Sequence, residues 1–203
     1  MAYNLNNKLV IAISSRALFD LEEENQIFEK DGLDAYYKYQ LENQDKSLKK
    51  GTGYRLVENI LKINSFFSSD ERQVEVIILS KNNAATSLRI TNAINDLKLD
   101  IIRSAWTSGT NISNYLKAFK VDLFLSADDN DVLNAIENGV AAAKILHSNE
   151  NIHNISNEQV RIAFDGDAVL FSEESELVYK NHGLEAFIEH EKENRNNPLE
   201  MGP

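Results

Sequence analysis

The stretch Leu9-Val-Ile-Ala-Ile13 (LVIAI) is a short run of β-branched and apolar residues that ends directly before Ser14-Ser15-Arg16. Buried strands of parallel sheets have this pattern, because both faces of such a strand are covered. Three further runs have similar length and composition and also end in a small or acidic residue: Val74–Leu79, Val121–Leu125 and Arg161–Phe164. The sequence therefore predicts four strands of a parallel sheet.

Helical patterns occupy the segments between these runs. Apolar residues recur at helical spacing after Tyr54, after Thr86, and after Asn130 or Asp131, either of which could cap its helix. Alternating strands and helices predict a three-layer, Rossmann-like α/β fold, in which right-handed crossovers place helices on both sides of the sheet. Ligands of such folds bind beyond the carboxyl ends of the strands. Those ends are here rich in polar residues: Ser14–Arg16, Ser80–Asn83, Ser126–Asp129 and Asp165–Asp167.

The first and last segments of the chain resemble each other. Adding 151 to a residue number in the first segment gives a similar residue in the last, as in these pairs: Ile11 and Ile162, Ala12 and Ala163, Ala17 and Ala168, Gly32 and Gly183, Gly51 and Gly202. We therefore expect an internal repeat, with a complete copy in residues 1–150 and the opening of a second copy in residues 151–203. Where the first copy has Ser14 and Arg16, the second has Asp165 and Asp167.

The composition excludes several classes of function. A formal net charge of -11, with 32 acidic against 21 basic residues, argues against a surface for nucleic acid polymers. The absence of cysteine excludes disulfides, zinc–thiolate sites and cysteine nucleophiles. The apolar run at Leu9–Ile13 is too short for a signal peptide core or a membrane span. We therefore expect a cytoplasmic protein without a membrane partner.

The segment Ile162–Ser172 (IAFDGDAVLFS) places two aspartates between apolar runs. Burying an unpaired carboxylate is costly unless a metal or a reaction requires it. Because Asp165 and Asp167 are two residues apart after a strand, both can point the same way, so one can attack phosphorus while the other handles the proton of the leaving group. A magnesium ion would offset the repulsion between carboxylate and phosphate. The alternative is a strand-end turn with solvated acids.

Together with three further segments, these residues make the whole chain resemble the cytosolic 5'-nucleotidase type I family, which is similar to haloacid-dehalogenase (HAD)-type phosphatases. The segments are LVIAISSRALFDLEEENQIFEKDGLDAYYKYQLE (9–42), YLKAFKVDLFLSADDNDV (115–132) and YKNHGLEAFIEHEKEN (179–194). The resemblance implies a HAD-like fold and magnesium-dependent hydrolysis of nucleoside 5'-monophosphates, AMP among them. It implies that Asp165 is the nucleophile that forms an aspartyl-phosphate, and that Asp167 is the general acid and then base.

The resemblance also suggests partners for the two aspartates. It implies that Ser80 and Lys117 contact the phosphate, and that Asp128 and Asp129 join Asp165 and Asp167 as ligands of the metal. Each of these residues has a purely structural alternative, because Ser80, Asp128 and Asp129 precede helical patterns that they could cap, and Lys117 could simply be solvated.

The second copy stops at Pro203, before it reaches a serine, lysine and acidic pair of its own. The chain is then either a truncated form, which is the simpler explanation, or uses the groups of the first copy. The alternative function is a non-catalytic module that binds nucleotide or assembles with a partner. We expect apolar surface in residues 161–203 to favour self-association as a homo-oligomer. We also expect strand 161–164 to lie at an edge or in a separate domain, which leaves Asp165 and Asp167 exposed.

Overall fold

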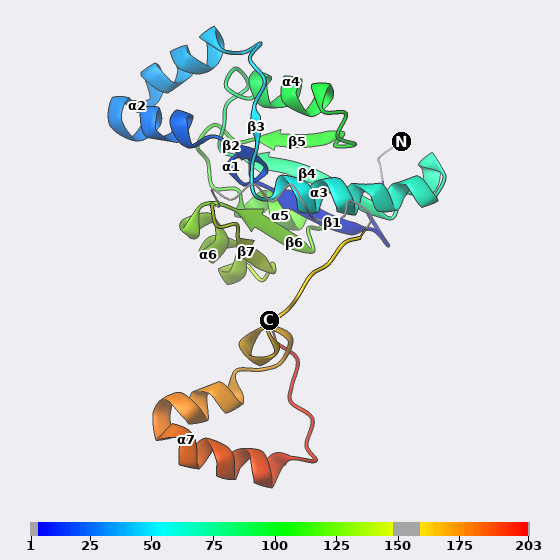
Figure 1. Cartoon of the computed structure of the whole chain (residues 1–203), viewed down its shortest axis with the longest axis vertical. Coiled ribbons are helices and arrows are strands. Elements are labelled where there is room, and N and C mark those ends of the chain that lie inside the picture. Colours follow the sequence, from blue (N-terminus) through cyan, green and yellow to red (C-terminus); the bar gives the residue numbers. More distant parts are fainter. Residues whose placement is uncertain (1–3, 148–158, 203) are drawn as a thin grey trace. The chain divides into compact units, whose positions relative to one another are not determined.

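The computed structural model describes residues 4–147 and 159–202 (Figure 1). The chain divides into two compact units, residues 1–160 (unit 1) and residues 161–203 (unit 2). Within the described residues, the structure contains no helix that is both long and apolar enough to cross a bilayer.

Unit 1 contains a parallel sheet of five strands in the order β5-β4-β1-β6-β7. The strands are β1 (Leu9–Ile13), β4 (Val74–Ser80), β5 (Arg103–Trp106), β6 (Leu123–Ser126) and β7 (Ala142–Lys144). Strand β1 is central, with Ile11 in register with Val76 on one side and Leu123 on the other. The predicted strands at the positions of β1, β4 and β6 are confirmed, although β6 begins two residues later than predicted. The edge strands β5 and β7 are only partly buried, so they lack the apolar run that reveals a strand.

Helices cover both faces of this sheet, which confirms the predicted three-layer α/β fold. The α-helices of unit 1 are α1 (Ser15–Leu18), α2 (Glu22–Glu42), α3 (Tyr54–Leu61), α4 (Leu88–Asp96), α5 (Ser113–Ala118) and α6 (Asp129–Glu137). Two short 3-10 helices follow α3, η1 (Lys62–Phe66) and η2 (Ser69–Glu71). A separate antiparallel pair consists of β2 (Phe19–Asp20) and β3 (Lys49–Lys50). Asp128 caps α6, because its Oδ1 accepts a hydrogen bond from Asp131 N at 2.9 Å. Asp128 was one of the candidate caps that the sequence offered, together with Asp129, Asn130 and Asp131.

Alternate residues of the central strands pack into two separate hydrophobic cores, one on each face of the sheet. Ile11, Ile13 and Val76 pack with α3 and α4 on one face, whereas Val10 and Ala12 pack with α5 and α6 on the other. Because both faces are covered, β1 and β4 need to be apolar almost throughout. The polar groups of this unit therefore gather where the strands end.

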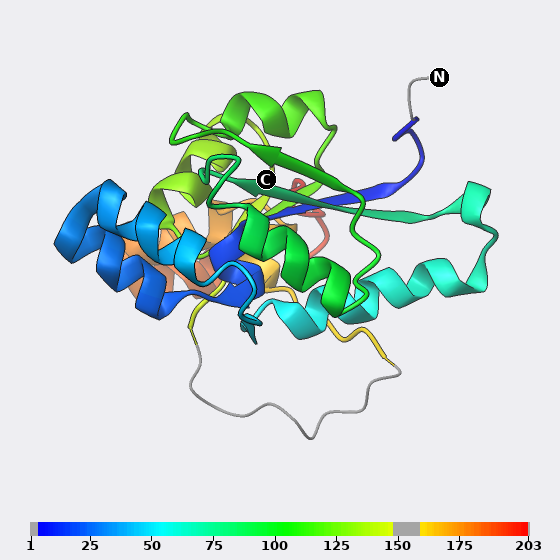
Figure 2. The same ribbon diagram turned by 90° about the horizontal axis from the view of Figure 1, so that it is seen from above.

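Helix α2 lies beyond the carboxyl ends of the strands (Figures 1 and 2). It consists of two helical arms joined at Gly32, whose backbone angles (φ 83°, ψ -174°) interrupt the helix. Across this kink, the rings of Phe28 and Tyr36 meet edge to face with centroids 5.9 Å apart. Because of this kink, the two arms of α2 fold toward each other beyond the strand ends.

Unit 2 consists of a short π-helix, η3 (Gly166–Leu170), and the long helix α7 (Glu174–Asn194), which is kinked at Gly183. Phe171 and Met201 form an isolated antiparallel bridge. The predicted strand Arg161–Phe164 is wrong, since these residues form no strand and are exposed. In the described part of unit 2 no strand lies beside them, and an extended segment needs a paired neighbour to satisfy its backbone hydrogen bonds.

Replacing Gly32 by Ala should destabilise unit 1 by about 1–3 kcal/mol, because the backbone conformation at Gly32 is accessible essentially only to glycine. No atom lies within 4 Å of a Cβ built there, so the cost is one of conformation and not of collision. Urea unfolding, followed by the fluorescence of Trp106, measures this change in the free energy of unfolding; Trp106 is the single tryptophan of the chain. Asp31→Ala, at the exposed neighbouring position, is the control. Equal midpoints for Gly32→Ala and Asp31→Ala would contradict this account.

Candidate functional site

A cavity of about 710 Å³ lies between the carboxyl ends of β1, β4 and β6 and the covering helix α2. Its floor contains residues that directly follow or end the strands, and its wall contains apolar side chains of α2. The main floor residues are Ser14, Ser15, Ser80, Asn82, Ser126 and Asp128, and the main wall residues are Phe28, Leu33 and Tyr36. The cavity occupies the place where parallel α/β folds bind ligands.

Hydroxyl and amide groups connect the floor of the cavity to its wall. Ser80 Oγ donates to Asn82 Oδ1 at 2.6 Å and lies 2.9 Å from Ser15 Oγ. Asn82 Nδ2 in turn donates to Tyr36 Oη at 2.7 Å. Burial raises the pKa of the Tyr36 hydroxyl above its usual value, so this group stays neutral through the physiological range.

The cations beside the cavity are held in ion pairs. Arg16 binds Glu22 through two hydrogen bonds, from Nε to Oε1 at 2.9 Å and from Nη2 to Oε2 at 3.1 Å, and the hydrogen bond from Arg16 lowers the pKa of the Glu22 carboxyl. Lys81 Nζ lies 2.6 Å from Asp131 Oδ1. Burial raises the pKa of the Asp131 carboxyl, and Lys81 partly offsets this effect.

A buried ion pair fixes α2 to the body of unit 1. Arg89 of α4 donates from Nη1 to Glu24 Oε1 at 2.5 Å, and both residues are less than a tenth exposed. Nη1 of the same guanidinium also lies 3.5 Å from Gln40 Oε1, while its Nε donates to the carbonyl oxygen of Lys46 at 3.1 Å. Since Glu24 and Gln40 lie on opposite arms of α2, Arg89 contacts both sides of the kink.

The structure brings together only some of the predicted site residues. Ser80 and Asp128 both line the cavity of unit 1. Asp129 is exposed and binds Lys144 Nζ at 2.7 Å through its Oδ2. Lys117 is exposed on α5 and is not among the residues that line the cavity. Sequence reasoning included Lys81 only within the polar strand end Ser80–Asn83 and Asp131 only as a possible helix cap, and it missed the ion pair that joins them at the cavity.

Asp165 and Asp167 belong to unit 2, where both are exposed as expected. Asp165 immediately precedes η3, and Asp167 lies within it. The turn is closed by a hydrogen bond from Phe171 N to Gly166 O at 2.9 Å, which spans one residue more than an α-helical bond. Single π turns are rare and often occur at functional sites.

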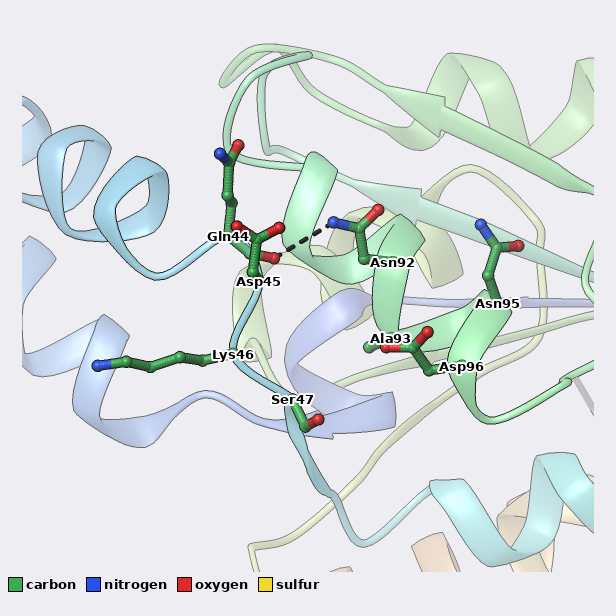
Figure 3. Close-up of a pocket in the computed structure, with 8 residues that line it drawn as sticks. All are labelled: Gln44, Asp45, Lys46, Ser47, Asn92, Ala93, Asn95 and Asp96. Atoms are coloured by element: carbon green, nitrogen blue, oxygen red, sulfur yellow. Dashed lines mark hydrogen bonds between the residues drawn. The ribbon is translucent and has the colours of Figure 1, made fainter.

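A second, smaller pocket of about 290 Å³ lies between the loop after α2 and helix α4 (Figure 3). Asn92 Nδ2 donates to the carbonyl oxygen of Gln44 at 3.3 Å across it. In Figure 3 the Lys46 side chain points away from the other lining side chains. The other charged side chains that line this pocket are the carboxylates of Asp45 and Asp96. This pocket offers no arrangement suited to catalysis.

The fold and the cavity define an α/β protein with a ligand cleft at the ends of its parallel strands. The family model of the 5'-nucleotidases matches residues 1–203, so the chain belongs to the 5'-nucleotidase family. It is similar to the human protein named cytosolic 5'-nucleotidase 1B, with 34% identity over 201 residues that cover 97% of this chain. The chain spans 33% of the length of that relative.

Replacing Arg89 by Met should destabilise unit 1 by about 3–5 kcal/mol, because Glu24 would keep a buried charge without its partner. The double variant Glu24→Met with Arg89→Met should recover most of this loss, since no charge is then stranded. Denaturant unfolding, followed by Trp106 fluorescence, measures the free energy of unfolding of the single and the double variant.

The control is Lys38→Met, which removes an exposed ion pair with Glu42 on the same helix and should cost less than about 1 kcal/mol. If Arg89→Met and Lys38→Met had the same effect, the buried pair would not be what fixes α2.

Proposed function

We propose that this chain carries the catalytic aspartates of a HAD-like 5'-nucleotidase that hydrolyses nucleoside 5'-monophosphates, such as AMP, to nucleoside and phosphate. One observation carries the proposal: a chain of the 5'-nucleotidase family presents Asp165 and Asp167, both exposed, at the start of a π turn. Exposure leaves both carboxylates accessible to a substrate, and the two-residue spacing allows different roles within one reaction.

The reaction proceeds in two steps. A carboxylate oxygen of Asp165 attacks phosphorus, the bond from phosphorus to the 5'-oxygen breaks, and Asp167 gives its proton to the departing nucleoside. Water then attacks the phosphorus of the aspartyl-phosphate, Asp167 takes a proton from that water, and inorganic phosphate leaves as Asp165 is regenerated. Asp167 therefore acts first as an acid and then as a base.

The donor chemistry of Asp165 and Asp167 fits magnesium, which proteins often hold through one or two carboxylates together with substrate phosphate and water. When bound, the ion neutralises charge between the attacking carboxylate and the phosphate. Among residues 4–147 and 159–202, no group of three or more His, Cys, Asp or Glu side chains is arranged for a metal. Roles for Asp128 and Asp129 as further ligands, and for Ser80 and Lys117 at the phosphate, stay predictions.

We also propose that residues 151–203 repeat the opening of the copy formed by residues 1–150. Matching glycines kink both long helices, since Gly32 and Gly183 each have φ 83°. The aromatic pair Tyr179–Phe187, at 6.1 Å, matches the pair Phe28–Tyr36 at 5.9 Å. A hydrogen bond from Gly51 N to Leu18 O at 2.9 Å resembles one from Gly202 N to Leu170 O at 3.0 Å, although Leu170 lies one residue beyond Val169, the match of Leu18. These parallels support a common unit in which Asp165 corresponds to Ser14.

Two further parts of the proposal concern the setting of the protein. The relative is named as a cytosolic protein, and we propose the same compartment for this chain. Exposed apolar side chains in unit 2, among them Phe164, Leu184 and Met201, support self-association.

The reaction is tested by phosphate release from AMP in the presence of magnesium. Asp165→Asn should lower the rate roughly 10³-fold or more, because it removes the nucleophile, and Asp167→Asn should lower it roughly 10²–10⁴-fold. Asp70→Asn, an exposed aspartate of η2, should leave the rate unchanged. Equal rates for the wild-type chain and Asp165→Asn would refute the assignment, and they would favour a non-catalytic module.

A further inference from the structure

The charges of the unit 1 cavity do not suit a phosphate group. Its lining contains two cations, Arg16 and Lys81, and three carboxylates, those of Glu24, Asp128 and Asp131. Both cations are already neutralised in ion pairs, Arg16 by Glu22 and Lys81 by Asp131. Glu24 is in turn paired with Arg89, so Asp128 is the lining carboxylate for which the described residues show no ion pair. A phosphate dianion would therefore meet the Asp128 carboxylate and would have to break an existing pair to gain a cation.

Uncharged polar groups dominate the floor instead. Hydroxyls and amides from the ends of three strands converge there, namely Ser14, Ser15, Ser80, Asn82, Asn83, Thr86 and Ser126. Ser80 is only 7% exposed and Ser126 only 1%, so the protein holds these groups in fixed positions. Such groups can both donate and accept hydrogen bonds, as ligands with several hydroxyls require.

The opposite wall is apolar and aromatic, and it is accessible. Phe28 is 48% exposed and Leu33 is 60% exposed, although both line the cavity. Tyr36 completes this wall, and its Oη accepts hydrogen bonds from Gln40 at 3.1 Å and from Asn82 at 2.7 Å. The hydroxyl proton of Tyr36 is therefore a donor that a ligand can use, beside a ring edge or face against which a planar ligand can pack.

From these features we infer that the unit 1 cavity binds an uncharged ligand that combines an aromatic ring with several hydroxyls, the chemistry of a nucleoside, and does not transform it. At the end of β1 the cavity has Ser14 and no carboxylate, and Ser14 Oγ is occupied as an acceptor from Ala17 N and Ser126 Oγ, both at 3.3 Å. The inference goes beyond the proposed hydrolysis and rests on residues of unit 1 alone.

The size of the cavity agrees with such a ligand. A volume of about 710 Å³ lies within the range of roughly 300–1,000 Å³ that is usual for small-molecule sites. The polar floor and the apolar wall both line the cavity, so a nucleoside would direct its sugar hydroxyls toward the floor and the hydroxyl proton of Tyr36, and its base toward Phe28 and Leu33.

Calorimetric titration of the chain with adenosine, AMP and inorganic phosphate, each without magnesium, tests this inference. Adenosine should bind, AMP should bind at least about tenfold more weakly, and phosphate should give no saturable signal. Phe28→Ala and Leu33→Ala should each weaken adenosine binding, Phe28→Ala by about tenfold, as expected for the loss of one stacking contact. Both positions are substantially exposed, so the variants should fold, and circular dichroism verifies this.

Two matched controls locate the site. Phe66→Ala removes an aromatic ring of unit 1 that is 84% exposed and does not line the cavity, and Tyr179→Ala removes the exposed ring of α7 in unit 2. Neither should change adenosine binding. Tighter binding of AMP than of adenosine, full affinity in Phe28→Ala, loss of affinity in Tyr179→Ala, or no binding of adenosine at all would each overturn the inference. None of these outcomes bears on the phosphate-release assay of Asp165→Asn.

Discussion

The contact between Arg89 and Glu24 determines whether unit 1 has a cavity. Helix α2 has few buried side chains of its own, and among its residues only Glu24 and Gln40 are fully enclosed. Arg89 reaches both, so one guanidinium of α4 secures the two arms of the kinked helix. A buried ion pair of this kind contributes little net stability compared with an apolar contact, but it offsets its desolvation cost only when the two charged groups are held in a well-defined geometry. The position of the cavity wall is therefore set by electrostatics and hydrogen bonding more than by hydrophobic packing.

The two units present their polar side chains in different ways. In unit 1 the charged groups around the cavity other than Asp128 are held in ion pairs, and neutral hydroxyls and amides line much of the cavity. In unit 2 the turn around Asp165 and Asp167 presents two exposed carboxylates. Hydroxyls and amides suit an uncharged molecule, whereas exposed carboxylates can provide ligands for a cation.

The sequence was most informative where the protein is most buried. Leu9–Ile13 and Val74–Leu79 are recognisable because a central parallel strand is apolar on both faces, and the strand-end rule then finds Ser80 and Asp128. The edge strands β5 and β7 escape detection because solvent covers part of each. The apolar run at 161–164 was misleading, because an apolar sequence forms a strand only where a neighbour can pair with it.

The contacts that shape the site could not be predicted in the same way. Glu24 and Arg89 are 65 positions apart, and no local pattern relates them. Lys117 satisfies a sequence motif but lies on the solvent side of α5, since a motif fixes the order of residues and not the face of a helix. Tertiary packing decides these points.

The π turn after Asp165 has a consequence for protein engineering. In unit 1 the first turn after β1 is α-helical, with Phe19 N bonded to Ser15 O, whereas the turn in unit 2 joins Phe171 N to Gly166 O and so contains one residue more. Replacing Ser14 and Arg16 by aspartates would give unit 1 the two acidic side chains of the unit 2 turn. The turn in unit 1 would still contain one residue fewer than the turn in unit 2. The second carboxylate would then leave the turn in a different direction, so a faithful transplant requires an insertion as well as two substitutions.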